Sequence, residues 1–143
     1  MIHICVIDGQ GGGIGGAIIK RIKADFGEAV EITALGTNAI ATAQMLKARA
    51  NKGASGENAI IRTSQTADVI IGPAGIIVAH ALMGEVTPLM AEAVAACPAQ
   101  KILIPLFQEN VAFVGLRQEP LPHLLDAMIE NHLKDLCQEH NNV

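Results

Sequence analysis

The sequence predicts an α/β fold with a mostly parallel sheet, and three observations carry this prediction. Short apolar runs rich in β-branched residues, such as Ile2–Ile7 and Val69–Ile71, are typical of buried parallel strands. Between such runs, apolar residues recur at helical spacing, as in Ile18, Ile22 and Phe26. Strands that alternate with helices imply a parallel sheet, because each crossover helix brings the chain back to the same end of the sheet.

The first half of the chain follows this alternation. The first strand leads through a glycine loop into a helix that Gly27 ends, and Val30–Leu35 forms the second strand. Asn38 is expected to cap the next helix. Residues 51–58 (NKGASGEN) are expected to form a polar loop and residues 59–62 a short third strand. Right-handed crossovers then favour an order in which the first strand pairs with both the second and the fourth.

The second half of the chain predicts further elements of the same kind. Thr87 and Pro88 are a typical N-cap and first-turn pair. The expected elements are a buried helix over Ile76–Met83, a helix from Thr87 to Cys97, strands over Lys101–Leu106 and Val111–Gly115, and an amphipathic helix over Leu121–Leu136. We expect residues 1–137 to form a single domain and residues 138–143 a disordered tail.

Composition excludes several classes of function. The net charge is −4 and there is no basic block, so we expect no binding to nucleic acid. The three cysteines lack a Cys-x-x-Cys spacing, which predicts a reduced, cytoplasmic chain without a zinc site. No signal peptide is visible at the N-terminus, and the longest uncharged stretch, Val69–Gly84, is too short and too polar for a membrane span.

The most informative segment is the glycine loop after the first strand, which reads Asp8-Gly9-Gln10-Gly11-Gly12-Gly13-Ile14-Gly15. Together with Gly16 it contains the pattern Gly-x-Gly-x-x-Gly, between a strand and a helix. Glycines let a phosphate approach the backbone, and the helix N-terminus offers free N–H groups. No Gly-Lys-Ser/Thr follows, so the loop is not a P-loop. A tight strand-to-helix turn that binds nothing is the alternative interpretation.

A second glycine turn follows the strand Val69–Ile71, as Gly72-Pro73-Ala74-Gly75. If this strand lies beside the first, the turn faces the glycine loop across the crevice where the strand order reverses. Open α/β sheets bind ligands at such a crevice. Small residues chosen for packing are the alternative interpretation of this turn.

The loop resembles the cofactor loop of the short-chain dehydrogenase/reductases. Gly9, Gly13, Ile14, Gly15, Ala17 and Ile18 match that family's pattern, and Asp8 replaces its threonine. The resemblance implies that the loop contacts a dinucleotide pyrophosphate and that Ala74 and Gly75 lie near the adenosine. The family's Tyr-x-x-x-Lys cannot exist here because the chain has no Tyr, so its reductase chemistry does not carry over. The whole chain is also similar to an uncharacterised bacterial family of short Rossmann-like proteins.

Two details argue against an ordinary NAD site. The carboxylate of Asp8 would repel a pyrophosphate unless a metal ion, a cap or a set of N–H groups neutralised it. The second strand ends without the Asp or Glu that grips a ribose hydroxyl. Thr37 and Asn38 follow that strand and are candidates for a ribose contact, although helix capping is the competing role. No catalytic residue is assigned: we expect His80 to be a buried structural residue and Glu85 to be solvated. Gln108, Glu109 and Asn110 follow the strand Lys101–Leu106 and are expected to form a polar surface turn, with a ligand contact as the alternative.

The sequence thus predicts a Rossmann-like three-layer sandwich that binds a nucleotide or dinucleotide, with NAD and NADP as candidates, in a binding or regulatory role. The alternatives are a small enzyme on a phosphorylated or nucleotide-like substrate, and a structural oligomer without a ligand. Apolar faces over Ile76–Met83 and Leu121–Leu136 predict a homo-oligomer. Neither nucleic acid nor a membrane is expected as a partner.

Overall fold

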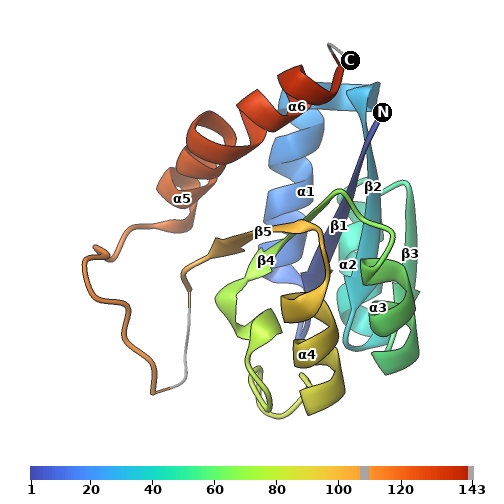
Figure 1. Cartoon of the computed structure of the whole chain (residues 1–143), viewed down its shortest axis with the longest axis vertical. Coiled ribbons are helices and arrows are strands. Elements are labelled where there is room, and N and C mark those ends of the chain that lie inside the picture. Colours follow the sequence, from blue (N-terminus) through green and yellow to red (C-terminus); the bar gives the residue numbers. More distant parts are fainter. Residues whose placement is uncertain (107–109, 142–143) are drawn as a thin grey trace.

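The computed structural model describes residues 1–106 and 110–141 (Figure 1). The strands are β1 (Ile2–Asp8), β2 (Val30–Gly36), β3 (Lys52–Ser55), β4 (Val69–Pro73) and β5 (Gln100–Ile104). The α-helices are α1 (Gly13–Phe26), α2 (Ala39–Lys47), α3 (Glu57–Ser64), α4 (Pro88–Ala96), α5 (Leu121–Met128) and α6 (Lys134–Asn141). Two 3-10 turns, η1 (Gly27–Ala29) and η2 (Ala74–Ile77), and a π-helical stretch, η3 (Ile129–Leu133), complete the described elements.

The five strands form one parallel sheet in the order β3-β2-β1-β4-β5. β1 pairs with β2 along its whole length, from Ile2 opposite Val30 to Asp8 opposite Gly36, and on its other side with β4. The predicted pairing of the first strand is therefore confirmed. The strand order reverses beside β1, so the carboxyl ends of β1 and β4 flank the switch point of the sheet.

Alternation along the strands divides the core into two layers. Ile4 and Val6 of β1 point to the layer formed by α1, α2 and the C-terminal helices, whereas Cys5 and Ile7 point to the layer formed by α3 and α4. Each of these four side chains is buried. This arrangement is the Rossmann-like three-layer sandwich that the sequence predicts.

The segment between α2 and β4 differs from its prediction. The expected polar loop over 51–58 contains β3, and the expected strand over 59–62 lies inside α3. β3 tolerates a polar sequence because it is an edge strand with mostly exposed residues. α3 buries Ile60 and Ser64, which are one helical turn apart, and Glu57 in its first turn suits the helix dipole.

The expected buried helix over Ile76–Met83 is also wrong. Only η2 is helical there, and the chain then runs through turns in which His80, Leu82 and Met83 have positive φ angles of 69°, 55° and 56°. A right-handed helix excludes such angles. The prediction rested on uniformly apolar residues, which carry no helical period: Ile76 and Ala81 are buried while the side chain of Met83 is 89% exposed.

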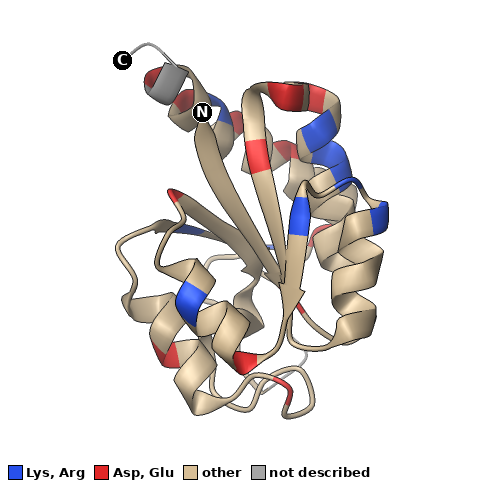
Figure 2. Ribbon diagram, turned by 90° about the vertical axis from the view of Figure 1, so that its right-hand side faces the viewer, with Lys and Arg blue, Asp and Glu red and all other residues tan. Residues whose placement is uncertain are grey.

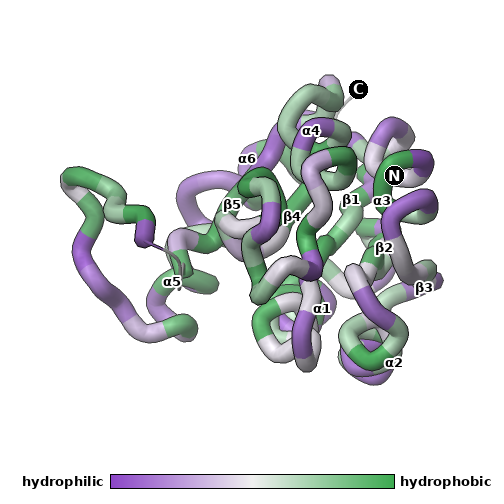
Figure 3. Tube along the Cα trace, turned by 90° about the horizontal axis from the view of Figure 1, so that it is seen from below, coloured by the Kyte–Doolittle hydropathy of each residue, from purple (hydrophilic) through white to green (hydrophobic). Residues whose placement is uncertain are grey.

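Residues 110–120, which precede α5, lie away from the body of the molecule, as Figure 3 shows. Residues 111–115 form no strand, contrary to the prediction, and the five-stranded sheet ends at β5 without them. The helix predicted over Leu121–Leu136 is confirmed as α5, η3 and the first part of α6. α6 continues to Asn141, into the segment expected to be a disordered tail, and residues 142–143 lie outside the described residues. None of the described helices has the length and apolar character needed to cross a bilayer.

Candidate functional site

The glycine loop connects β1 to α1 at the switch point of the sheet. Gly12 precedes the helix in the left-handed conformation, with φ of 75°, and its N–H donates to the carbonyl oxygen of Gly9 at 2.9 Å. A side chain is strained at this φ, so the turn itself requires Gly12. The loop and the start of α1 lie where the sequence predicts them.

Several loop glycines are required by packing rather than by a ligand. A Cβ on Gly15 would lie 2.6 Å from Sδ of Met45, and one on Gly9 would lie 2.9 Å from Leu82 and 3.0 Å from Glu85. Gly11 and Gly13 differ, because a Cβ on either would meet no atom within 4 Å. Neither has a positive φ, and neither N–H donates a hydrogen bond to the described residues. The fold therefore does not account for glycine at these two positions.

The carboxylate of Asp8 is buried under the loop. It accepts hydrogen bonds from the N–H of Gly9 at 2.8 Å and from the N–H of Gly15 at 2.6 Å. Burial raises the pKa of Asp8, the N–H groups of Gly15 and Gly9 oppose this, and the charge of Glu85 adds to the rise in pKa. Asp8 thus accepts hydrogen bonds from N–H groups that a ligand would otherwise use, and its carboxylate does not point out of the loop as a free charge.

Glu85 holds the loop to the end of β2. One oxygen, Oε1, accepts hydrogen bonds from the N–H of Gln10 at 2.8 Å, the hydroxyl of Thr37 at 2.6 Å and the amide of Asn38 at 2.7 Å. Burial raises the pKa of Glu85, but these hydrogen bonds outweigh it and leave the pKa below its ordinary value. The second oxygen, Oε2, accepts no hydrogen bond within residues 1–106 and 110–141.

Glu85 is the residue of this site that sequence reasoning missed. The expectation of a solvated side chain is wrong, since Glu85 is half-buried and fully engaged through Oε1. It comes from the turn after Leu82, far along the chain from Gln10, so no local pattern marks it. β2 does not end in an Asp or Glu, and the carboxylate of Glu85 lies beside Thr37 and Asn38 at the end of this strand instead.

Three of the residues predicted to form the site lie in this cluster: Gln10, Thr37 and Asn38. Asn38 caps α2, because its Oδ1 accepts from the N–H of Ala41 at 2.8 Å, and its amide also donates to the carbonyl oxygen of Gln10 at 3.0 Å. Gln10 has a positive φ of 50°, in a loop otherwise built mainly of glycine. Glu85 and Asn38 together hold Gln10 in this strained conformation.

The second glycine turn is buried. Gly72, Pro73, Ala74 and Gly75 are all covered, and a Cβ on Gly72 would strike the backbone carbonyl of Ile7. Leu82 lies between the two turns, 2.9 Å from a Cβ on Gly9 and 3.6 Å from one on Gly75. The turn therefore reaches the switch point, but Leu82 fills the space between it and the glycine loop.

The remaining candidate groups do not join the cluster. His80 is exposed, so the expectation of a buried structural histidine is wrong. Gln108 and Glu109 lie outside the described residues. Burial raises the pKa of Cys5 to about 12, which makes its thiol unreactive. Within the described part of the chain, no three His, Cys, Asp or Glu side chains gather to hold a metal ion.

The fold and the loop define a class: a Rossmann-like α/β protein with a glycine loop at the switch point of its sheet. The chain belongs to the family described as "Domain of unknown function (DUF3842)", whose model matches residues 3–137. This confirms the similarity to an uncharacterised family.

Comparison with other proteins adds one solved structure. The chain is similar to a dodecameric FMN-dependent Ubix-like decarboxylase from Escherichia coli O157:H7, with 15% sequence identity, a TM-score of 0.45, and coverage of 95% of this chain and 94% of that chain. No curated protein matches the sequence.

Proposed function

We propose that the protein binds a nucleotide or dinucleotide at the glycine loop, as a binding or regulatory module. The observation that carries this proposal is the bare surface at Gly11 and Gly13. Their N–H groups donate to no acceptor in the part of the chain that the structure describes, and the fold does not need glycine there, whereas close approach of a ligand to the backbone does.

Glu85 supports a ligand with a ribose. In Rossmann-like sites an acid at the end of the second strand accepts hydrogen bonds from ribose hydroxyls. Here Oε1 of Glu85 is fixed by Thr37, Asn38 and Gln10, which leaves Oε2 as an oriented acceptor. No described arginine pairs with this cluster, so the proposal favours a free 2′-hydroxyl, as in NAD, over the 2′-phosphate of NADP.

Asp8 and Leu82 limit how the ligand binds. Asp8 already occupies the N–H groups of Gly9 and Gly15, so a phosphate has Gly11 and Gly13 left to bind. Leu82 must move before a base reaches Ala74 and Gly75. The turn that carries Leu82 has four residues with positive φ between His80 and Gly84, which suits a segment that rearranges.

The test is a dye-based melting screen with adenosine, NAD, NADP, FMN and ATP. We expect NAD to raise the Tm, since ligand at about 100 times its Kd adds roughly 2.7 kcal/mol. Gly13→Val is expected to keep the fold and abolish the shift, because the added side chain enters open space over the loop. Ala24→Val, on the exposed side of the same helix, is the control that retains the shift.

Two outcomes would contradict the proposal. The absence of a shift with every nucleotide favours the alternative of a structural protein whose loop is only a turn. Turnover of a phosphorylated substrate favours the alternative of a small enzyme. Gly15→Val is not a suitable variant, since its side chain would displace Met45 and unfold the site for reasons of packing.

We also propose that the protein is a homo-oligomer, although on a different surface from the one expected. Ala81, Leu125, Met128 and Leu133, on the two faces expected to meet another chain, are buried in this chain's own core, and of the first face Ile77 and Met83 stay exposed. Four exposed apolar side chains lie close together in the sequence between β5 and α5: Val111, Phe113, Val114 and Leu116. β5 is an edge strand beside this segment, and an unpaired edge is a site for association.

Val114→Asp is expected to dissociate the oligomer, because Val114 is fully exposed in the single chain and a buried unpaired charge opposes association. Light scattering after size exclusion measures the mass. Leu89→Asp, at an exposed apolar position of α4, is the control that leaves the mass unchanged. A monomeric wild-type protein would contradict this proposal.

A further inference from the structure

A groove of about 380 Å³ runs along the seam between α1 and α2. Small residues of α1, Gly13, Gly16 and Ala17, line one part of it, and Lys20, Lys47 and Arg49 line another. We call this the basic groove. Six of the ten Lys and Arg residues of the chain fall within residues 20–52, although the protein as a whole carries a net charge of −4. Figure 2 shows the blue segments gathered on the side of the molecule where α1 and α2 lie.

The three cations of the basic groove have no partner among the described residues. Nearby, Arg21 pairs with Asp25 and Asp126, Lys52 pairs with Glu31, and Lys23 donates to the side-chain oxygen of Asn51. The acidic groups of Asp25 and Glu31 are thus engaged by cations outside the groove. Lys20, Lys47 and Arg49 remain, and three like charges around one groove repel one another until an anion binds between them.

Arg49 stands in an unfavourable backbone conformation. It follows the end of α2 with a positive φ of 85°, at a position where glycine or asparagine is the usual residue. The left-handed conformation is unfavourable for an arginine, because its Cβ crowds the backbone. Such strain points to a role for the side chain, and its planar guanidinium is suited to bidentate binding of a phosphate.

We propose that the basic groove is an anion site for a small soluble ligand with at least two negative charges, such as a diphosphate or triphosphate group. Its volume lies in the range of small-molecule sites and is too small for a folded partner. The groove includes Gly13 but none of the residues of the Glu85 cluster. This proposal therefore does not require that the ligand carry a ribose or a base.

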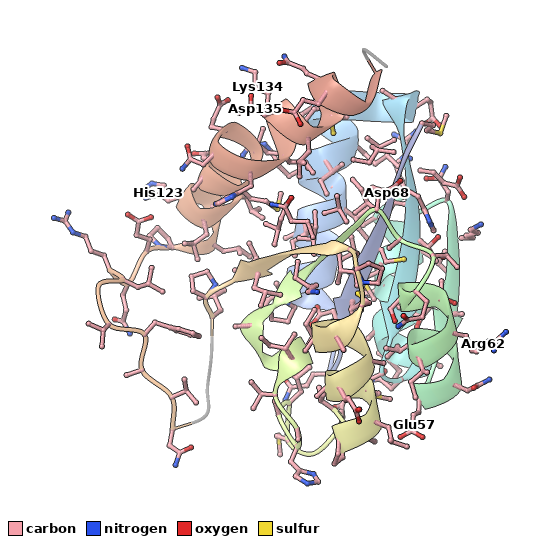
Figure 4. All side chains as sticks on the ribbon, in the orientation of Figure 1. Glu57, Arg62, Asp68, His123, Lys134 and Asp135 are labelled. Atoms are coloured by element: carbon pink, nitrogen blue, oxygen red, sulfur yellow. The ribbon has the colours of Figure 1, made fainter. Side chains whose placement is uncertain are left out.

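Inorganic pyrophosphate and tripolyphosphate test the groove directly by titration calorimetry. We expect both to bind the wild-type protein, and the triple variant Lys20→Gln, Lys47→Gln, Arg49→Gln to bind at least about tenfold more weakly, which is 1.4 kcal/mol. The control is Arg62→Gln. Arg62 projects from α3, in the layer on the other side of the sheet (Figure 4). It has the same charge and no partner in residues 1–106 and 110–141.

Arg49→Gly separates binding from folding. Relief of the left-handed strain is expected to raise the Tm by about 3 °C, while pyrophosphate affinity falls. A loss of affinity in a stabilised variant cannot come from unfolding.

Four outcomes would overturn the proposal: no binding of either phosphate up to about 1 mM, unchanged affinity in the triple variant, equal weakening by Arg62→Gln, or binding to vesicles of phosphatidylserine with none to soluble phosphates. Adenosine, which carries no phosphate, probes the Glu85 cluster alone. If pyrophosphate binds and adenosine does not, the proposed ribose contact at Glu85 is contradicted and the proposed anion site in the basic groove is supported.

Discussion

Gly72→Ala is expected to destabilise the fold by about 3 kcal/mol and to lower the Tm by about 10 °C. A Cβ at this position would strike the backbone carbonyl of Ile7 in the paired strand and would lie 2.9 Å from Cδ1 of Ile76. A backbone carbonyl cannot move aside without breaking the pairing of β1 with β4, which is the centre of the sheet. Thermal and urea unfolding measure the effect.

Gly11→Ala is the matched control for Gly72→Ala. A Cβ on Gly11 meets nothing within 4 Å and its φ is not in the left-handed region. Its alanine variant is therefore expected to unfold as the wild type does, or to be more stable by about 0.5 kcal/mol, because alanine lowers the conformational entropy of the unfolded chain. Equal stability of the two variants would show that Gly72 is not required by packing.

Glu85→Gln is expected to lower both stability and ligand affinity at neutral pH. The carboxylate oxygen receives three hydrogen bonds, and those to a charged acceptor are about twice as strong as those to a neutral one. We expect a loss of about 1–2 kcal/mol in unfolding free energy. Affinity for adenosine should fall as well, because the glutamine amide replaces one of the two acceptor oxygens.

The pH dependence of this loss distinguishes the charge of Glu85 from its shape. Its pKa is lowered in the folded state, so its stabilisation is complete above the unfolded value of about 4.5 and disappears as the pH falls through the folded value. The difference in Tm between the wild type and Glu85→Gln should therefore close at acidic pH. Glu92→Gln, an exposed control on α4, should show little difference at any pH.

Asp8 acts in the opposite direction. Burial raises its pKa above 3.8, so Asp8 keeps its proton to a higher pH in the folded protein than in the unfolded chain. Its contribution to stability therefore declines as the pH rises from about 3.8 through the folded value. A difference between wild type and Glu85→Gln that widened at low pH would contradict the assignment of charge to Glu85.

Local sequence rules predicted the elements whose determinants are local. The strands β1, β2 and β4 are apolar runs, and Asn38 and Thr87 cap helices through their own side chains, as predicted. The predictions for the segments of β3 and α3 were wrong, because both elements are short and the position of a strand at the sheet edge depends on its neighbours. The helix predicted over Ile76–Met83 was wrong for residues 78–83, because no apolar pattern in the sequence indicates a turn with positive φ angles.

The candidate site divides in the same way. The glycine loop, Thr37 and Asn38 adjoin strand ends and were predicted from their positions in the sequence. Glu85 reaches them only because the chain after β4 turns back over the loop. No pattern in the sequence of residues 84–86 predicts this turn. The basic groove likewise joins Lys20 to Arg49 through the packing of α1 on α2, which no spacing in the sequence shows.

The single oxygen of Glu85 ties together three separate connections of the chain: the loop after β1, the turn after β2 and the segment before α4. Because they are joined at one atom, we expect these segments to open and close as one cooperative unit rather than to fray independently. The backbone amides of the glycine loop should therefore share one common hydrogen-exchange opening with the segment around Glu85, so that motion at one end of this unit is felt at the other.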